Sequence, residues 1–212
     1  MKDGVSGEKV NIAVFVSGGG TNLQALLDAE KNGVIRSGHI VLVVSDNPSA
    51  YALQRAKKAG KNTAIAEKIG RSQAEFEADL TAVLKKYNIG LIVLAGFLRI
   101  LSPSFVKNYE NRIINVHPSL IPSFCGKGYY GLRVHEAALA YGVKVTGATV
   151  HFVNEIPDGG KIIMQKAVEI QPDDTPETLQ QRVMREAEWK ILPLSAEKVC
   201  ENMLARENEE NE

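Results

Sequence analysis

Short runs of β-branched residues alternate with helix-like segments over most of this chain. Residues 10–16, 39–45 and 91–94 are continuous apolar runs with the length of a strand buried on both faces. Between the first two runs, residues 21–30 place three leucines on one face of a helix, and Thr21 is expected to cap its start. The alternation predicts an α/β fold with a mainly parallel sheet and helices on both faces.

The other elements predicted before Gly142 follow the same order. Ser72 and Glu75 have the spacing of a capping box, which predicts a helix that continues to about residue 87. The remaining segments are a strand at 62–66, a short helix opened by Ser102-Pro103, a strand at 112–116, and a helix at 132–141 that ends at Gly142.

The pattern changes after Gly142. Residues 144–153 and 161–170 are both strand-like, and no helix separates them. They are therefore expected to form an antiparallel pair near the C-terminal end of a sheet of about seven strands. Thr175-Pro176 then begins a long helix, which we expect to be interrupted at Pro193 and to resume to about residue 204.

The length of 212 residues fits one large domain, which we place at residues 1–205. Residues 206–212 are acidic and lack apolar anchors, so a disordered tail is expected there. The first ten residues contain no apolar segment, and this predicts that the chain has no signal peptide.

Charge and cysteine content exclude several classes of protein. Lys plus Arg and Asp plus Glu both number 25, so no general attraction for nucleic acid or for an anionic membrane is expected. The two cysteines, Cys125 and Cys200, are far apart in the sequence and form neither a disulfide framework nor a zinc ribbon. A reducing, cytoplasmic location is predicted.

Ser17, three glycines and Thr21-Asn22 connect the first strand to the first helix. Glycines let a ligand approach the backbone, and free N–H groups at a helix start attract an anion. The segment lacks the lysine of a P-loop, and it also lacks the third glycine and the well-placed acid of a dinucleotide fingerprint, since Asp46 comes too late. A monophosphate site is the favoured interpretation, with a tight glycine turn as the alternative.

Asn115 and His117 lie at the carboxyl end of a predicted strand, the edge at which open α/β sheets bind ligands. Residues i and i+2 of a strand point to the same face. Asp158 belongs to the loop between the two late strands, and near His117 its charge would raise the pKa of that histidine and orient the ring. A structural histidine and an ordinary Asp-Gly turn are the alternatives.

Other candidates are weaker. Residues 98–101 are either core with one surface arginine or the wall of a pocket for an aromatic ligand. Glu188 is either a solvated helix charge or a site residue, and His151 is either a core hydrogen-bonder or a site residue. His135 is predicted on an exposed helix face. No His, Cys or acidic residue has the spacing of a metal site, so no metal is expected.

Five sequence blocks together resemble the folate-dependent phosphoribosylglycinamide formyltransferases of purine synthesis. They stand in the family's order over nearly the whole chain: VSGGGTNLQAL at 16–26, LAGFLRILS at 94–102, NVHPSLIP at 115–122, TVHFV at 149–153 and DGG at 158–160. The resemblance implies a seven-stranded, mostly parallel, Rossmann-like sheet, which agrees with the pattern above.

The resemblance also implies roles for individual residues. The catalytic set would be Asn115, His117 and Asp158. The phosphate and adjacent parts of glycinamide ribonucleotide would be bound by Gly20, Thr21, Asn22, Leu23 and Gln24, with Glu188 near the glycinamide end. The folate site would be formed by Leu98, Arg99, Ile100 and Leu101, together with Asn115. Two positions do not transfer: the stretch 122–131 is longer than in shorter members, and the basic residue toward the folate corresponds to Gln73, with Arg71 nearby.

The implied reaction is direct transfer of the formyl group from 10-formyltetrahydrofolate, a co-substrate, to the amine of glycinamide ribonucleotide. Asn115 and a protonated His117 would stabilise the oxyanion of a tetrahedral intermediate, and Asp158 would keep His117 charged. The implied partners are small molecules only, with the chain as a monomer or a homodimer.

Two alternatives remain at this stage. The formyltetrahydrofolate deformylases and methionyl-tRNA formyltransferases share the Asn-x-His-Pro-Ser block and the distal Asp, but they resemble longer chains with an added domain. A phosphate- or nucleotide-binding module without catalysis would keep the glycines, but it has no need for Asn115, His117 and Asp158 together.

Overall fold

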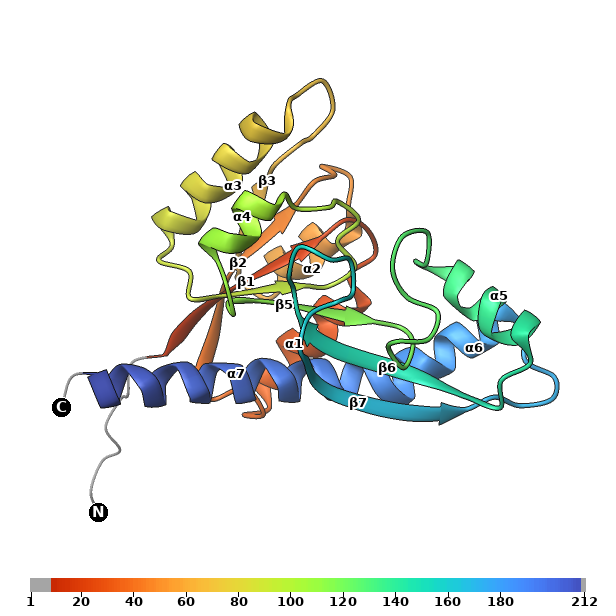
Figure 1. The fold of residues 1–212 in the computed structure, drawn as a ribbon. Coiled ribbons are helices and arrows are strands. Elements are labelled where there is room, and N and C mark those ends of the chain that lie inside the picture. Colours follow the sequence, from red (N-terminus) through yellow and green to blue (C-terminus); the bar gives the residue numbers. More distant parts are fainter. Residues whose placement is uncertain (1–8, 211–212) are drawn as a thin grey trace, which may run out of the picture.

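A computed structural model describes residues 9–210, and Figure 1 shows how their helices and strands are arranged. The strands form one seven-stranded sheet in the order β3-β2-β1-β4-β5-β6-β7. β1 to β5 are parallel, whereas β6 is antiparallel to both of its neighbours. The strands are β1 (Val10–Val16), β2 (Gly38–Ser45), β3 (Asn62–Ile65), β4 (Leu91–Leu94), β5 (Ile113–His117), β6 (Val145–Phe152) and β7 (Ile162–Glu169). The predicted fold class is confirmed.

Helices cover both faces of this sheet (Figure 1). α3 and α4 pack on one face, and α1, α2, α6 and α7 pack on the other. The helical segments are α1 (Thr21–Lys31), α2 (Tyr51–Lys58), α3 (Gln73–Lys86), α4 (Pro103–Asn108), α5 (Leu132–Tyr141), α6 (Pro176–Val183), the π-helical turn η1 (Met184–Glu188) and α7 (Trp189–Glu210).

The two faces of β1 show how the sheet is held. Ile12, Val14 and Val16 belong to the apolar core under α1, α2, α6 and α7, whereas Ala13 and Phe15 belong to the core under α3 and α4. All five side chains are buried. Because the strand is buried on both faces, its sequence is continuously apolar rather than alternating.

Several local sequence signals act as predicted. Ser72 accepts a hydrogen bond from the N–H of Glu75, whose carboxylate accepts one from the N–H of Ser72, so the capping box of α3 is present. Ser102 caps α4 through its hydroxyl. Gly142 ends α5 in the left-handed conformation that glycine adopts easily.

The structure differs from the sequence analysis at the first two helices. Gly20, not Thr21, is the N-cap of α1, and no side chain caps this helix. α2 was not predicted, because it is short and its buried face is made of Ala52, Leu53 and Ala56, which give a weak apolar signal.

The C-terminal helix also differs from the prediction. The interruption is η1 rather than Pro193, which lies inside α7. Pro193 is close to the start of α7, so it removes only an early hydrogen bond of that helix. Residues 206–210 continue α7, since Arg and Glu readily extend a helix that packing has already formed, and the disordered tail stays a prediction.

Residues 211–212 of the predicted tail lie outside the described residues, and so does most of the N-terminal segment predicted to lack a signal peptide. Within residues 9–210, no helix is both long and apolar enough to cross a membrane.

Candidate active site

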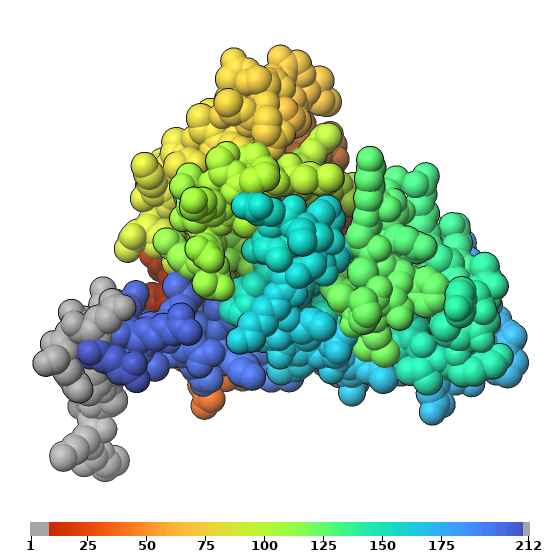
Figure 2. All heavy atoms as spheres, in the orientation of Figure 1, coloured from red at the N-terminus to blue at the C-terminus, as the bar shows by residue number. Residues whose placement is uncertain are grey.

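The candidate site lies at the edge of the sheet where the parallel strands end. β1 and β4 are neighbours at the point where the strand order reverses, and open α/β sheets bind ligands in the crevice outside this point. The glycine loop, defined here as residues 17–20, follows β1, the segment 96–101 follows β4, and His117 ends β5. Figure 2 shows the loop between β6 and β7 lying between the segments that follow β4 and β5.

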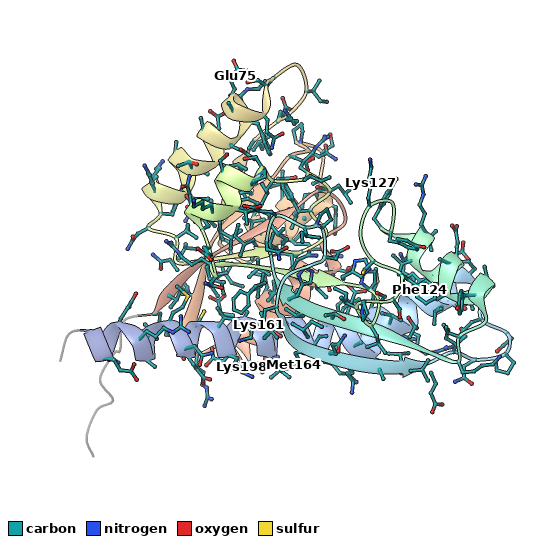
Figure 3. The ribbon with its side chains drawn as sticks, in the orientation of Figure 1. Glu75, Phe124, Lys127, Lys161, Met164 and Lys198 are labelled. Atoms are coloured by element: carbon teal, nitrogen blue, oxygen red, sulfur yellow. The ribbon has the colours of Figure 1, made fainter. Side chains whose placement is uncertain are left out.

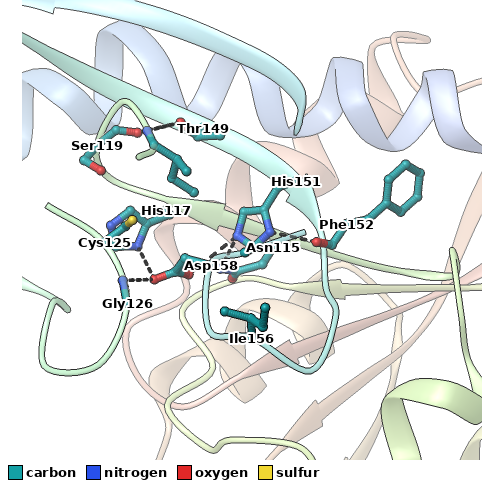
Figure 4. A network of polar contacts seen from close by, with 12 residues as sticks. Asn115, His117, Ser119, Cys125, Gly126, Thr149, His151, Phe152, Ile156 and Asp158 are labelled. Carbon is teal, nitrogen blue, oxygen red and sulfur yellow. Dashed lines mark hydrogen bonds and ion pairs between the residues drawn. The ribbon is translucent and has the colours of Figure 1, made fainter. Parts of the chain in front are cut away.

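Asp158, in the loop between β6 and β7, is the centre of a polar network (Figure 4). Its Oδ2 accepts a hydrogen bond from the N–H of Gly126 at 2.8 Å and lies 3.5 Å from Nδ1 of His117. Its Oδ1 lies 3.6 Å from Nε2 of His151. Burial by itself raises the pKa of Asp158, but the contact with His151, the charge of His117 and the N–H of Gly126 outweigh it, so this pKa lies below its ordinary value. Asp158 is therefore ionised at neutral pH.

His117 is buried at the end of β5. Its Nε2 lies 2.9 Å from the carbonyl oxygen of Phe124, and because a carbonyl only accepts, this nitrogen carries a proton. Nδ1 then faces Asp158. Asp158 acts to raise the pKa of His117, as predicted, but burial is the larger effect and the pKa lies below its ordinary value. Asp158 therefore opposes the effect of burial on His117, and the expectation that it keeps His117 charged stays a prediction.

His151 belongs to the same network, although sequence reasoning left its role open. The antiparallel register pairs it with Asn115 across β5 and β6. Its Nδ1 lies 2.8 Å from the carbonyl oxygen of Phe152, and its Nε2 lies 3.2 Å from Nδ2 of Asn115. Because Nδ1 donates to that carbonyl, Nε2 accepts from Asn115 when the ring is neutral and donates toward Oδ1 of Asp158 when the ring is protonated. Only the register of β5 and β6 places His151 beside Asn115, and this register cannot be read from the sequence.

A cavity of about 150 Å³ joins this network to the segment after β4. Asn115, His151 and Asp158 line one part of it, and the rest of the wall includes Phe97, Arg99, Ile100, Leu101 and Ile156. Ile100 and Ile156 are 76% and 65% exposed, which leaves apolar surface for a flat ligand. His117 and Leu98 do not line the cavity, so His117 stands behind Asp158.

The loop at 122–131 fixes both members of the His117–Asp158 pair. The carbonyl oxygen of Phe124 accepts a hydrogen bond from Nε2 of His117, and the N–H of Gly126 donates to Asp158. Phe124 has a φ of 48°, and its ring packs against Tyr129 at 6.4 Å and Tyr141 at 5.9 Å between centroids. Figure 3 labels Phe124 on this loop, which leads to α5. Sequence comparison assigned this stretch no role, whereas the structure makes it a support for the network.

The sequence predicts His135 on an exposed helix face, and this prediction is wrong. His135 lies fully buried on α5, and neither ring nitrogen has a hydrogen-bond partner. Burial, with a smaller contribution from His117, lowers the pKa of His135 to about 4. The prediction failed because α5 packs against α6, which buries a helix face that appears polar in the sequence.

The glycine loop contains glycines of two kinds. Gly20 has a φ of 73°, and a Cβ there would lie 2.6 Å from Cβ of Ala52, so the fold itself requires glycine. A Cβ on Gly18 or Gly19 would meet nothing within 4 Å, and neither has a positive φ. A tight turn therefore accounts for Gly20 alone, and open space over the other two leaves room for a ligand against the backbone.

This difference predicts the effect of adding one methyl group. Gly20→Ala is expected to lower stability by about 1–3 kcal/mol, because it combines a left-handed backbone with a steric clash. Gly19→Ala is the matched control, and its melting temperature should equal that of the parent. Thermal unfolding followed by circular dichroism tests both variants. Equal melting temperatures for the two variants would contradict the distinction.

Asn22 and Glu188 form a buried pair beside the glycine loop. Nδ2 of Asn22 donates to Oε2 of Glu188 at 2.7 Å, while Oδ1 of Asn22 is buried without a partner. Burial raises the pKa of Glu188 to about 6, and Asn22 opposes this shift. η1 places Glu188 at the start of α7, facing α1. Because both free oxygens can only accept, the pair is suited to a ligand that carries hydroxyl or amine hydrogens.

Comparison with known proteins gives the family. Residues 10–195 match the family described as formyl transferase. The phosphoribosylglycinamide formyltransferase of Haemophilus influenzae is 41% identical over 184 residues, which cover 86% of this chain and 84% of that protein. The chain belongs to the phosphoribosylglycinamide formyltransferase family. A crystal structure of glycinamide ribonucleotide transformylase 1 from Symbiobacterium toebii has a TM-score of 0.86 at 38% identity, covering 94% of this chain and 92% of that one.

Other relatives of this chain are larger proteins. The trifunctional purine biosynthetic protein adenosine-3 of Gallus gallus is 45% identical over 91% of this chain, which spans only 18% of that protein. A chloroplastic phosphoribosylglycinamide formyltransferase of Arabidopsis thaliana is 36% identical over 95% of this chain and 70% of its own length. Because this relative is chloroplastic, the cytoplasmic location stays a prediction.

The residues that the formyltransferase resemblance placed near the phosphate lie together at the start of α1. Leu23 is fully buried in the core, so only its backbone can contact a ligand. Oε1 of Gln24 accepts from Nη1 of Arg55 at 3.1 Å, and Nε of Arg55 donates to the carbonyl of Gly19 at 2.8 Å. Arg55 therefore adds positive charge beside the glycine loop. The sequence analysis did not identify Arg55 because it did not predict α2.

The structure also shows what Gln73 and Arg71, the two candidates for a contact with the folate, bind. Gln73 donates to the carbonyl of Ile100 at 3.2 Å, so it contacts the segment after β4. Arg71 instead pairs with Asp79 at 2.6 Å on α3. Over the described range 9–210, no group of three or more His, Cys, Asp or Glu side chains has an arrangement that could hold a metal ion.

Proposed function

We propose that this chain transfers the formyl group of 10-formyltetrahydrofolate to the amine of glycinamide ribonucleotide, a step of de novo purine synthesis. One observation carries the proposal: Asn115 and Asp158 line the same cavity as Arg99, Ile100 and Leu101. The amide and carboxylate therefore meet a wall suited to a flat ligand at the carboxyl ends of the sheet. Family membership supports the substrate pair, and family relatives carry this activity in their names.

The second substrate is placed at the other side of the crevice. β1 and β5 are separated by β4 alone, so the glycine loop lies about 10 Å, or two strand spacings, from the end of β5. Uncapped N–H groups at the start of α1 and the guanidinium of Arg55 suit a phosphate. Asn22 and Glu188 suit the hydrogens of a sugar or an amine. Glycinamide ribonucleotide bound in this way extends from the glycine loop toward Asp158.

The residues of the chain then divide the chemistry between them. The attacking amine adds to the formyl carbon, and Nδ2 of Asn115 donates to the oxygen that becomes negatively charged. The amine loses a proton, which the Asp158–His117 pair accepts, with the negative charge of Asp158 stabilising the imidazolium. When the bond to the folate nitrogen breaks, the pair returns this proton to that nitrogen. No covalent bond to the protein forms.

A formyl-transfer assay tests the proposal. Purified protein is incubated with 10-formyltetrahydrofolate, with and without glycinamide ribonucleotide, and the appearance of tetrahydrofolate is followed. Release is expected only with the ribonucleotide. Release without it would indicate a hydrolase, and no release in either case would indicate a binding module.

Asn22→Ala should separate the two substrate sites. The variant removes the free Oδ1 proposed to accept from the ribonucleotide and the amide that donates to Glu188. A hydrogen bond contributes about 0.5–1.5 kcal/mol, and about 1.5–3 kcal/mol where one group is charged, so the KM for glycinamide ribonucleotide is expected to rise about tenfold. Because the contact is made before and during the transition state alike, kcat should change less. The KM for the folate should stay at the parent value. Steady-state kinetics with each substrate varied in turn measures all three constants, and a rise in the folate KM instead would reverse the assignment of the two sites.

A further inference from the structure

The segment 96–101 forms the folate-side wall of the proposed site, yet little apolar packing holds it. It lies outside regular secondary structure, and Leu98 and Ile100 are 67% and 76% exposed. A wall of this kind needs polar contacts to stay in one position, because exposed side chains contribute little burial energy.

Those contacts come from the ends of the two neighbouring strands. Oγ of Ser17 accepts from the N–H of Leu98 at 2.9 Å, and the N–H of Ser17 donates to the carbonyl of Gly96 at 3.2 Å. Oδ2 of Asp46 accepts from Nε of Arg99 at 2.5 Å. Ser17 directly follows β1 and lies at the switch point of the sheet, whereas Asp46 directly follows β2, the strand next to β1 on the other side.

Asp46 cannot act on a ligand directly. Its side chain is 4% exposed, whereas that of Arg99 is 41% exposed. Oδ1 of Asp46 is buried and has no hydrogen-bond partner, so the single contact with Arg99 compensates the buried charge. In the described part of the chain, the Nη atoms of Arg99 make no hydrogen bond, and Arg99 lines the cavity. Any effect of Asp46 on binding must therefore pass through Arg99.

We propose that Asp46 is a positioning residue for the folate: it fixes Arg99, and together with Ser17 it ties segment 96–101 to the glycine loop. The wall of the cavity is thereby ordered before the folate arrives, so binding energy is not spent on ordering it. This inference rests on the proposed function for the identity of the ligand. Asp46 is one of the buried polar residues of the fold, and in this proposal it contacts neither substrate.

The test is Asp46→Asn, which keeps the shape of the side chain and removes its charge. We expect the KM for 10-formyltetrahydrofolate and the Kd for tetrahydrofolate to rise roughly tenfold, the change that about 1.4 kcal/mol of binding energy produces. kcat and the KM for glycinamide ribonucleotide should change little, because the wall contacts the folate equally before and during the transition state.

Asp174→Asn is the matched control. Asp174 is also a buried carboxylate bonded to an arginine, Arg182, but it lies in the turn between β7 and α6, at the end of β7 away from Asp158. Its folate KM should equal that of the parent. An equal rise in both variants would show a general loss of stability and would overturn the proposal, as would a parent-like folate KM and Kd in Asp46→Asn.

A double-mutant cycle tests whether Asp46 acts through Arg99. In an Arg99→Ala background, Asp46→Asn should have no further effect on the Kd for tetrahydrofolate. Additive effects would overturn the proposal. If Asp46→Asn does not fold, Arg99→Lys, which keeps the charge but loses Nε, should raise the same Kd. A parent that binds tetrahydrofolate without transferring the formyl group would contradict the proposed function alone, because the Kd comparison still applies, and a parent that binds no folate would contradict both.

Discussion

His117→Ala is expected to lower kcat for formyl transfer by at least about 10²–10³-fold, while glycinamide ribonucleotide still binds. The imidazole is held by the carbonyl of Phe124 on one side and faces Asp158 at 3.5 Å on the other. Without it, the group that faces Oδ2 of Asp158 and shares the proton lost by the amine is missing. Because His117 does not line the cavity, its removal should leave substrate contacts intact.

The measurement combines steady-state kcat with calorimetric binding of glycinamide ribonucleotide. His39→Ala is a suitable control, because His39 is half exposed and pairs with Glu30, away from the residues that line the cavity. Its kcat should match that of the parent. A parent-like kcat in His117→Ala would remove this residue from the proton path, and a loss of ribonucleotide binding would show that its role is structural.

The order of helices and strands could be predicted from the sequence because most of them have a recognisable local sequence pattern. The continuous apolar run of β1 reports burial on both faces, and the Ser72–Glu75 capping box marks the start of α3. Features that depend on packing between distant segments have no such local pattern. α2 has a small-residue face, and His135 is buried only because α5 packs against α6.

The candidate site was predictable as a set of residues, but not as a set of charges. Asn115, His117 and Asp158 do come together, as the resemblance implied. The register of β5 and β6, which adds His151 beside Asn115, is a property of strand pairing. The protonation state of His117 depends on how far burial outweighs Asp158, and burial is a property of the folded chain.

Asp158→Asn should lower kcat by at least about 10²-fold, because it removes the carboxylate that faces the cavity and stabilises the imidazolium. It should also move the titration of His117. The ordinary pKa of a histidine is about 6.5, and burial already places the pKa of His117 below its ordinary value. Asp158 opposes burial, so replacing its charge with a neutral amide lowers that pKa further.

The sign of the pH effect follows from the form that accepts the proton. If neutral His117 is the working form, kcat is lost as pH falls through the pKa of His117, and in Asp158→Asn this loss should begin at lower pH than in the parent. The two groups titrate as a pair, so the apparent values belong to both. Imidazole chemical shifts of His117 followed by NMR in parent and variant separate this titration from that of the substrate amine. An activity loss on the alkaline side alone would mean that the charged imidazole is the working form. An imidazole midpoint that rises in Asp158→Asn would contradict the pKa-raising effect of Asp158 on His117.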